Sequence, residues 1–145
     1  MQDKVVRRLA HMIDYCDLVE ARIESYGMTE STFRSSQDHR DLLLMPLIQI
    51  GELSAKIDRR TLSSLMPNES WGDICGFRNR IVHAYDLIDY RIAWDVASRD
   101  IPKLRARLVS IPEVFGFYKR AKELEKSDQA PMSLEEIVRR KLGGD

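Results

Sequence analysis

The sequence contains few cysteines, glycines and prolines, and it has no excess of charge of either sign. Its 145 residues include two cysteines, seven glycines and five prolines. Two cysteines exclude a disulfide framework and a four-cysteine zinc site, and their scarcity favours a reducing compartment. Lys and Arg number 23, as do Asp and Glu, so the net charge is zero. General electrostatic attraction to nucleic acid is therefore absent, and a nucleic-acid site must be a local basic patch.

Long apolar stretches are also missing. No run approaches the roughly 18 apolar residues of a membrane helix, and the first residues lack the apolar core of a signal peptide. Hydrophobic residues make up 43% of the chain and charged residues 32%, a balance typical of globular proteins. We expect a cytoplasmic protein without membrane association, and the length predicts a single domain.

Apolar residues recur at steps of three and four residues, which predicts helices. Such helices are expected over residues 4–25, 38–57, 71–85 and 89–108, with a short one over 59–66. The polar, serine-rich residues 29–37 predict a loop, and no segment alternates with the period of a strand. The predicted class is an all-α antiparallel helical bundle of four to five main helices. We assign residues 1–111 to this bundle and 112–145 to a charged C-terminal helical extension.

The predicted helix 71–85 carries an unusual set of polar residues. At about 100° per residue, Phe77 and Ile81 fall on one side of this helix, whereas Asn79 and His83 fall on the other. His83 is therefore expected to point away from the core. Arg78 lies about 140° around the helix from His83, so helical geometry alone does not bring the two side chains together.

An arginine and an outward-facing histidine suit metal-independent cleavage of RNA. The 2′-hydroxyl of RNA is its own nucleophile, so the protein needs only to move protons and to stabilise charge on the phosphate. Histidine titrates near neutral pH and can transfer either proton, while the arginine fork binds phosphate oxygens. Spacing alone is also compatible with an ordinary surface helix whose histidine caps a neighbour or forms an ion pair.

Residues 42–108 resemble the HEPN superfamily, and within it the HepT-type toxins. Gly51 and Glu52, in LIQIGELSAKI, match a Gly-Glu pair of the second family helix. The hallmark Arg-x4-His-x-Tyr is matched by Arg78, His83 and Tyr85. Further landmarks follow in order, namely Asn79 directly after the arginine and then Asp89, Trp94, Pro102 and Leu104 in the next helix.

The resemblance implies a metal-independent endoribonuclease toxin without a cofactor. Such proteins form homodimers in which the motifs of both subunits line one cleft, with Arg78 and His83 as catalytic residues and Asn79 in support. The resemblance further implies a type II-like toxin–antitoxin pair. Its antitoxin is an MNT-type nucleotidyltransferase that adds AMP to the motif tyrosine, here Tyr85, and so blocks access of RNA.

The best candidates for further RNA contact are Arg80, Arg59 and Arg60, because other basic residues are interspersed with acidic ones. A second function stays open. The chain could be a non-catalytic helical adaptor that binds a nucleotidyltransferase or nucleic acid, with the motif serving as a binding site.

Overall fold

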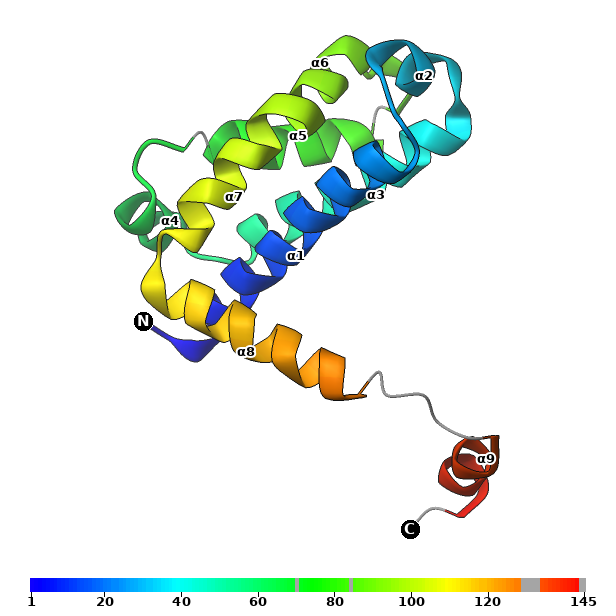
Figure 1. Ribbon diagram of the computed structural model, residues 1–145. Helices are drawn as coiled ribbons and strands as arrows, with labels where there is room; N and C mark the ends of the chain where they lie inside the picture. Colours follow the sequence, from blue (N-terminus) through cyan, green and yellow to red (C-terminus); the bar gives the residue numbers. More distant parts are fainter. Residues whose placement is uncertain (70, 84, 129–133, 144–145) are drawn as a thin grey trace.

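The computed structural model describes residues 1–69, 71–83, 85–128 and 134–143 (Figure 1). This described part is helical and contains no strand, which confirms the predicted all-α class. The long elements are α1 (Asp3–Ser25), α3 (Gln37–Ala55), α5 (Trp71–His83) and α8 (Pro112–Asp128). One further rod is built from α6 (Tyr90–Asp95), the π-helical segment η2 (Val96–Asp100) and α7 (Ile101–Val109), which follow one another without a break.

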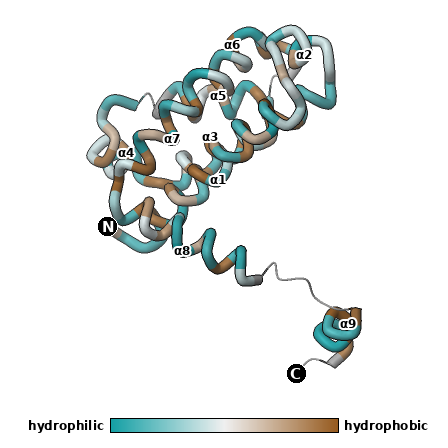
Figure 2. Tube along the Cα trace, viewed as in Figure 1, coloured by the Kyte–Doolittle hydropathy of each residue, from teal (hydrophilic) through white to brown (hydrophobic). Residues whose placement is uncertain are grey.

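The bundle is organised around α1, which packs against α3, α7 and α8, while α3 also packs against α5. Hydrophobic and hydrophilic residues alternate along the helices, as expected for amphipathic elements (Figure 2). The fully buried side chains come from most of these helices and include Leu9, Ile13, Phe33, Leu43, Ile50, Leu62, Leu108 and Val114. The core therefore extends from α1 to the first turn of α8.

The shorter elements are α2 (Glu30–Ser35), α4 (Arg59–Leu65), the 3₁₀ turn η1 (Tyr85–Leu87) and α9 (Leu134–Gly143). The predicted loop over residues 29–37 is wrong, because most of it forms α2. Thr29 and Thr32 bond reciprocally in a capping box, and Phe33 is completely buried. The side chains of residues 134–142 in α9 are all exposed.

Helix α3 continues through the buried Pro46, and a side chain of α1 compensates for the missing N–H. A proline cannot donate to the carbonyl four residues earlier, which here belongs to Leu42. Nη1 of Arg22 donates to this carbonyl oxygen over 2.6 Å. The two helices are thus joined at the point where the ladder of α3 loses a bond.

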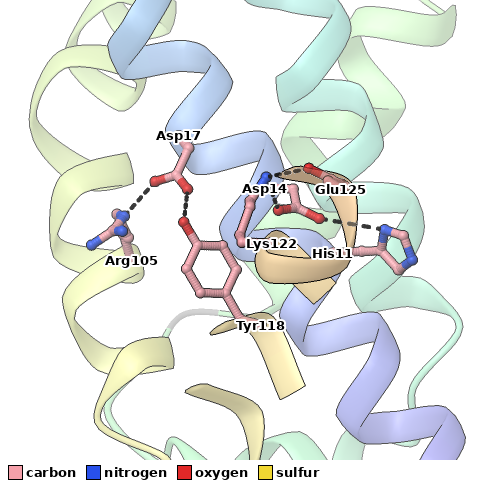
Figure 3. Close-up of polar contacts among 7 residues, drawn as sticks. All are labelled: His11, Asp14, Asp17, Arg105, Tyr118, Lys122 and Glu125. Atoms are coloured by element: carbon pink, nitrogen blue, oxygen red, sulfur yellow. Dashed lines mark hydrogen bonds and ion pairs between the residues drawn. The ribbon is translucent and has the colours of Figure 1, made fainter. Parts of the chain in front are cut away.

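A polar cluster fixes α8 to the bundle (Figure 3). Asp17 on α1 accepts a hydrogen bond from Nε of Arg105 on α7, at 2.5 Å, and another from the Tyr118 hydroxyl on α8. One turn away, Nζ of Lys122 on α8 lies 3.0 Å from Oδ1 of Asp14. Burial and the bond to Asp17 raise the pKa of Tyr118, so the protonated, donating form is favoured.

Cys16, beside this cluster, should make the protein less stable at alkaline pH. Burial, followed by the nearby charge of Asp17, raises the pKa of its thiol from 9.0 to about 12. The unfolded chain then loses this proton first, so the free energy of unfolding should fall as the pH rises above 9. We expect a loss of about 3 kcal/mol from this thiol between pH 8 and pH 11, measured by denaturant unfolding. The Cys16→Ala variant should lack this dependence of the free energy of unfolding on pH. The same pH dependence in both proteins would contradict a role for the Cys16 thiol.

Candidate active site

Helix α5 carries the Arg-x4-His motif, and its orientation agrees with the helical periodicity. Ile81 is 3% exposed and belongs to the core, and Phe77 is half-buried against it. Asn79 and His83 are both exposed. The chain turns into η1 soon after His83, which is the last residue of α5. The imidazole is therefore presented to solvent at the end of a helix whose opposite side is anchored in the core.

Arg78 does not extend freely into solvent but is held by a carboxylate of α3. Its Nε donates to Oε1 of Glu52 over 2.6 Å, and its Nη2 forms a shorter contact with the same oxygen. Its Nη1 donates to Oδ1 of Asn79 over 2.6 Å. A guanidinium group has five N–H donors, so two of them are left for an incoming oxygen. Glu52 and Asn79 thus fix the orientation of Arg78 while leaving it able to bind an anion.

Gly51 explains how α5 comes close enough to α3 for this ion pair. A Cβ atom at Gly51 would lie 2.3 Å from Cβ and 2.8 Å from Cγ of Arg78. These distances are shorter than van der Waals contact, so only a residue without a side chain fits beneath Arg78. Gly51 therefore permits the close approach of α3 and α5. Gly51 and Glu52 together form the surface on which Arg78 rests.

Tyr85 is separated from the regular part of α5. The predicted helix 71–85 ends at His83, and Tyr85 begins the 3₁₀ turn η1. The side chain of Tyr85, the predicted acceptor of AMP, lies outside the described ones. The next two residues, Asp86 and Leu87, are exposed, so this turn lies at the surface beside the exposed end of the motif helix.

The other predicted RNA contacts lie in two places. Arg80 is exposed in the last turn of α5, close in sequence to His83. Arg59 and Arg60 are exposed at the start of α4, which lies next to the beginning of α5 in Figure 1. The structure therefore groups Arg80 with the motif and places the other two arginines at the opposite end of α5.

Sequence reasoning missed two features around the motif. Glu52 was noted only as a landmark, although its position directly after Gly51 on the helix that faces α5 indicates a role beside Arg78. Large apolar side chains are also exposed near the motif: Val82 is 45% exposed on α5 and Leu87 is 80% exposed on η1. Met45 on α3 and Ile92 on α6 are about half exposed as well. The signal in the sequence is Val82, an apolar residue on the polar side of the motif helix.

Two further properties bear on the class of site. Among the described residues, no three His, Cys, Asp or Glu side chains come together in a way that would hold a metal ion. Within the same residues, no helix combines the length and the apolar character needed to cross a membrane.

Comparison with known proteins adds the evolutionary context of this site. A family model described as Ribonuclease HepT-like matches residues 12–111, a range that includes Glu52, Arg78 and His83. No solved structure matches the chain.

Curated relatives carry ribonuclease names. Over 105 residues the chain is 26% identical to "Putative RNase TTE0752" of Caldanaerobacter subterraneus subsp. tengcongensis. The aligned residues make up 71% of this chain and 89% of that protein. It is 36% identical over 56 residues to "Putative RNase MJ1380" of Methanocaldococcus jannaschii, covering 39% of this chain and 50% of the relative. It is 33% identical over 58 residues to "Probable ribonuclease HepT" of Thermococcus cleftensis, covering 40% and 52%.

The match thus spans about half the length of two of these relatives and most of the third. The family model covers more than two thirds of this chain, and it confirms the resemblance on which the motif was first interpreted. The chain belongs to the HepT-like ribonuclease family.

Proposed function

We propose that this protein is a metal-independent endoribonuclease in which His83 transfers protons and Arg78 stabilises the phosphate. The observation that carries the proposal is the arrangement on α5 in a HepT-like chain. Arg78 is oriented by Glu52 and Asn79, and the exposed imidazole of His83 lies at the end of the same helix. Arg78 is held firmly, as the binding of a phosphate in a fixed position requires. His83 is accessible, as proton transfer to and from the RNA requires.

The proposed reaction is transesterification within the RNA. The 2′-oxygen attacks the adjacent phosphorus, the bond from phosphorus to the 5′-oxygen breaks, and a 2′,3′-cyclic phosphate forms. One proton leaves the 2′-hydroxyl and one reaches the 5′-oxygen, and an imidazole can perform either transfer. The two free N–H groups of Arg78 stabilise the negative charge that builds up on the phosphate oxygens.

A homodimer would place two such motifs in one cleft. Val82, Leu87 and Met45 are exposed apolar residues on the elements that carry or adjoin the motif, and a contiguous apolar surface formed from them would suit an interface between copies. Pairing two copies across this surface would bury them and bring the two His83 side chains toward each other. His83 of one copy would then work with Arg78 of the other.

Cleavage assays on the purified full-length protein test this proposal. We expect RNA cutting to persist when EDTA is present in excess, because neither catalytic group requires a metal. The 5′ fragments should end in a 2′,3′-cyclic phosphate, which mass spectrometry distinguishes from a 3′-hydroxyl by its mass. Cutting that stops with EDTA and returns with Mg²⁺, or fragments with 3′-hydroxyl ends, would contradict the mechanism.

The cellular role we propose is that of a cytoplasmic toxin paired with an MNT-type nucleotidyltransferase antitoxin. The antitoxin would transfer AMP from ATP to Tyr85: the phenolic oxygen bonds to the α-phosphorus, pyrophosphate leaves, and the phenolic proton is released. The added phosphate carries negative charge next to the site and repels the RNA backbone. Exposed neighbours of Tyr85 in η1 support access by a modifying enzyme.

Tyr85→Phe should escape this control, because it keeps the ring and lacks only the acceptor oxygen. After incubation with the nucleotidyltransferase and ATP, wild-type protein should gain the mass of AMP and lose RNA cleavage. The Phe variant should keep its mass and its cleavage. Tyr90→Phe, in α6, is a matched control that should be modified like wild type. Equal modification of the Tyr85 variant would remove this residue from the regulation.

A non-catalytic adaptor is the second candidate, and the engagement of Arg78 by Glu52 favours it, since a paired arginine has less charge to offer a substrate. Expression without an antitoxin separates the two roles. The ribonuclease should arrest growth, and the His83→Ala variant should not. An adaptor would leave growth unaffected in both cases.

A further inference from the structure

A cavity lies on a face of α5 that the motif does not use. It encloses about 390 Å³ between α3, α5, η2 and α7, which is at the small end of the range for ligand sites. Its apolar lining comes from Leu47, Ile50, Ile74, Phe77 and Leu104. Phe77 lies about 160° around α5 from Asn79, so this cavity is separate from the candidate active site.

The mouth of the cavity has an unbalanced charge. Glu69 and Arg107, both lining residues, form an ion pair and neutralise each other. Asp73 on α5, Asp100 on η2 and Lys103 on α7 also line the cavity and are exposed. Among the described residues, none of these three side chains has a hydrogen-bond or ion-pair partner. Two free carboxylates and one free ammonium group leave one negative charge over an apolar interior.

The wall formed by η2 is itself unusual. This segment is a π-helix, a rare conformation that occurs mostly as single turns inside α-helices and is frequent at functional sites. Through it Val96 and Asp100 enter the lining, one apolar and one acidic. The helical rod is therefore irregular at the same place where a carboxylate borders the cavity.

We propose that this cavity binds a small organic monocation, an amine with an apolar or aromatic body. The ammonium group of the ligand would lie between Asp73 and Asp100, where its positive charge neutralises the excess negative charge of the mouth. The apolar body replaces water against the aliphatic lining and the ring of Phe77, and aromatic rings also attract cations. Anions are repelled by the two carboxylates. This inference does not depend on the ribonuclease activity.

Calorimetric titration of the full-length protein with tryptamine tests the charge and the apolar part together. Two matched ligands carry the same ring without the positive charge. Indole-3-ethanol is neutral, and indole-3-propionate is an anion. We expect saturable 1:1 binding of tryptamine, with affinity at least about tenfold weaker for both relatives, because a single well-placed charge is worth about that factor.

Variants then locate the site. Asp73→Asn and Asp100→Asn should each weaken tryptamine binding severalfold, whereas Lys103→Gln should strengthen it by removing a like charge. Asp38→Asn, on the exposed first turn of α3, is the control and should change nothing. All four positions are exposed, and an unchanged unfolding temperature verifies that the variants are folded.

Hydrogen exchange provides a second readout, since bound ligand should slow exchange in α5 and η2. The proposal is overturned if tryptamine does not saturate below about 1 mM, or if the neutral relative binds equally well. Affinities unaffected by the Asp73 and Asp100 substitutions would overturn it as well.

Discussion

Replacing His83 by alanine should lower the rate of RNA cleavage by a factor of about 10²–10⁴, the usual size of a lost acid–base step. The substitution should leave the free energy of unfolding nearly unchanged, because the side chain is exposed and lies at the end of α5. The rate is measured on a labelled RNA under single-turnover conditions. Asp86→Asn removes the charge of another exposed side chain three residues along and should retain activity. Wild-type rates in the alanine variant would exclude His83 from the chemistry.

Mixing two inactive variants shows whether one site draws on both subunits. If His83 of one copy works with Arg78 of the other, a dimer of one His83→Ala and one Arg78→Ala subunit contains one intact site. Refolding the two variants together at equal concentrations yields about half such mixed dimers, so about a quarter of wild-type activity should return. If each subunit carries its own complete pair, no mixed dimer has an intact site and activity should stay at the level of the separate variants.

The orientation of the motif could be predicted from the sequence because it depends only on local periodicity. Ile81 and His83 are two residues apart, so a helix must place them on different sides, and the structure shows one buried and the other exposed. The partner of Arg78 could not be predicted in this way. Glu52 is 26 positions earlier in the chain, and only the packing of α3 against α5 brings the two together.

The sequence prediction also failed where helix capping competes with a loop-like composition. Residues 29–37 are polar and rich in serine, which favours a loop, yet the capping box of Thr29 and Thr32 begins a helix there. The buried ring of Phe33 then ties α2 to the core. A single large apolar residue gives no periodicity, and for that reason pattern analysis could not detect this helix.

Gly51→Ala should destabilise the protein by about 1–3 kcal/mol and reduce RNA cleavage sharply, although alanine is the better helix former. The new Cβ would lie 2.3 Å from Cβ of Arg78, an atom next to the backbone that cannot rotate away. Helix α5 must therefore move outward, which lengthens the contacts between Arg78 and Glu52. A displacement of about 1 Å in a positioning group can cost about 10²-fold in rate.

Gly76→Ala is the matched control, because it makes the same change on α5 itself. Apart from its chain neighbours and the backbone of its own helix, nothing lies within 4 Å of a Cβ built at Gly76, so only the helical preference for alanine acts there. We expect this variant to be more stable by about 0.5–1 kcal/mol and to cleave RNA at the wild-type rate. The two variants should thus shift the free energy of unfolding, measured in urea, in opposite directions. Equal shifts would mean that Gly51 acts through helix propensity and that the close approach of α3 and α5 does not position Arg78.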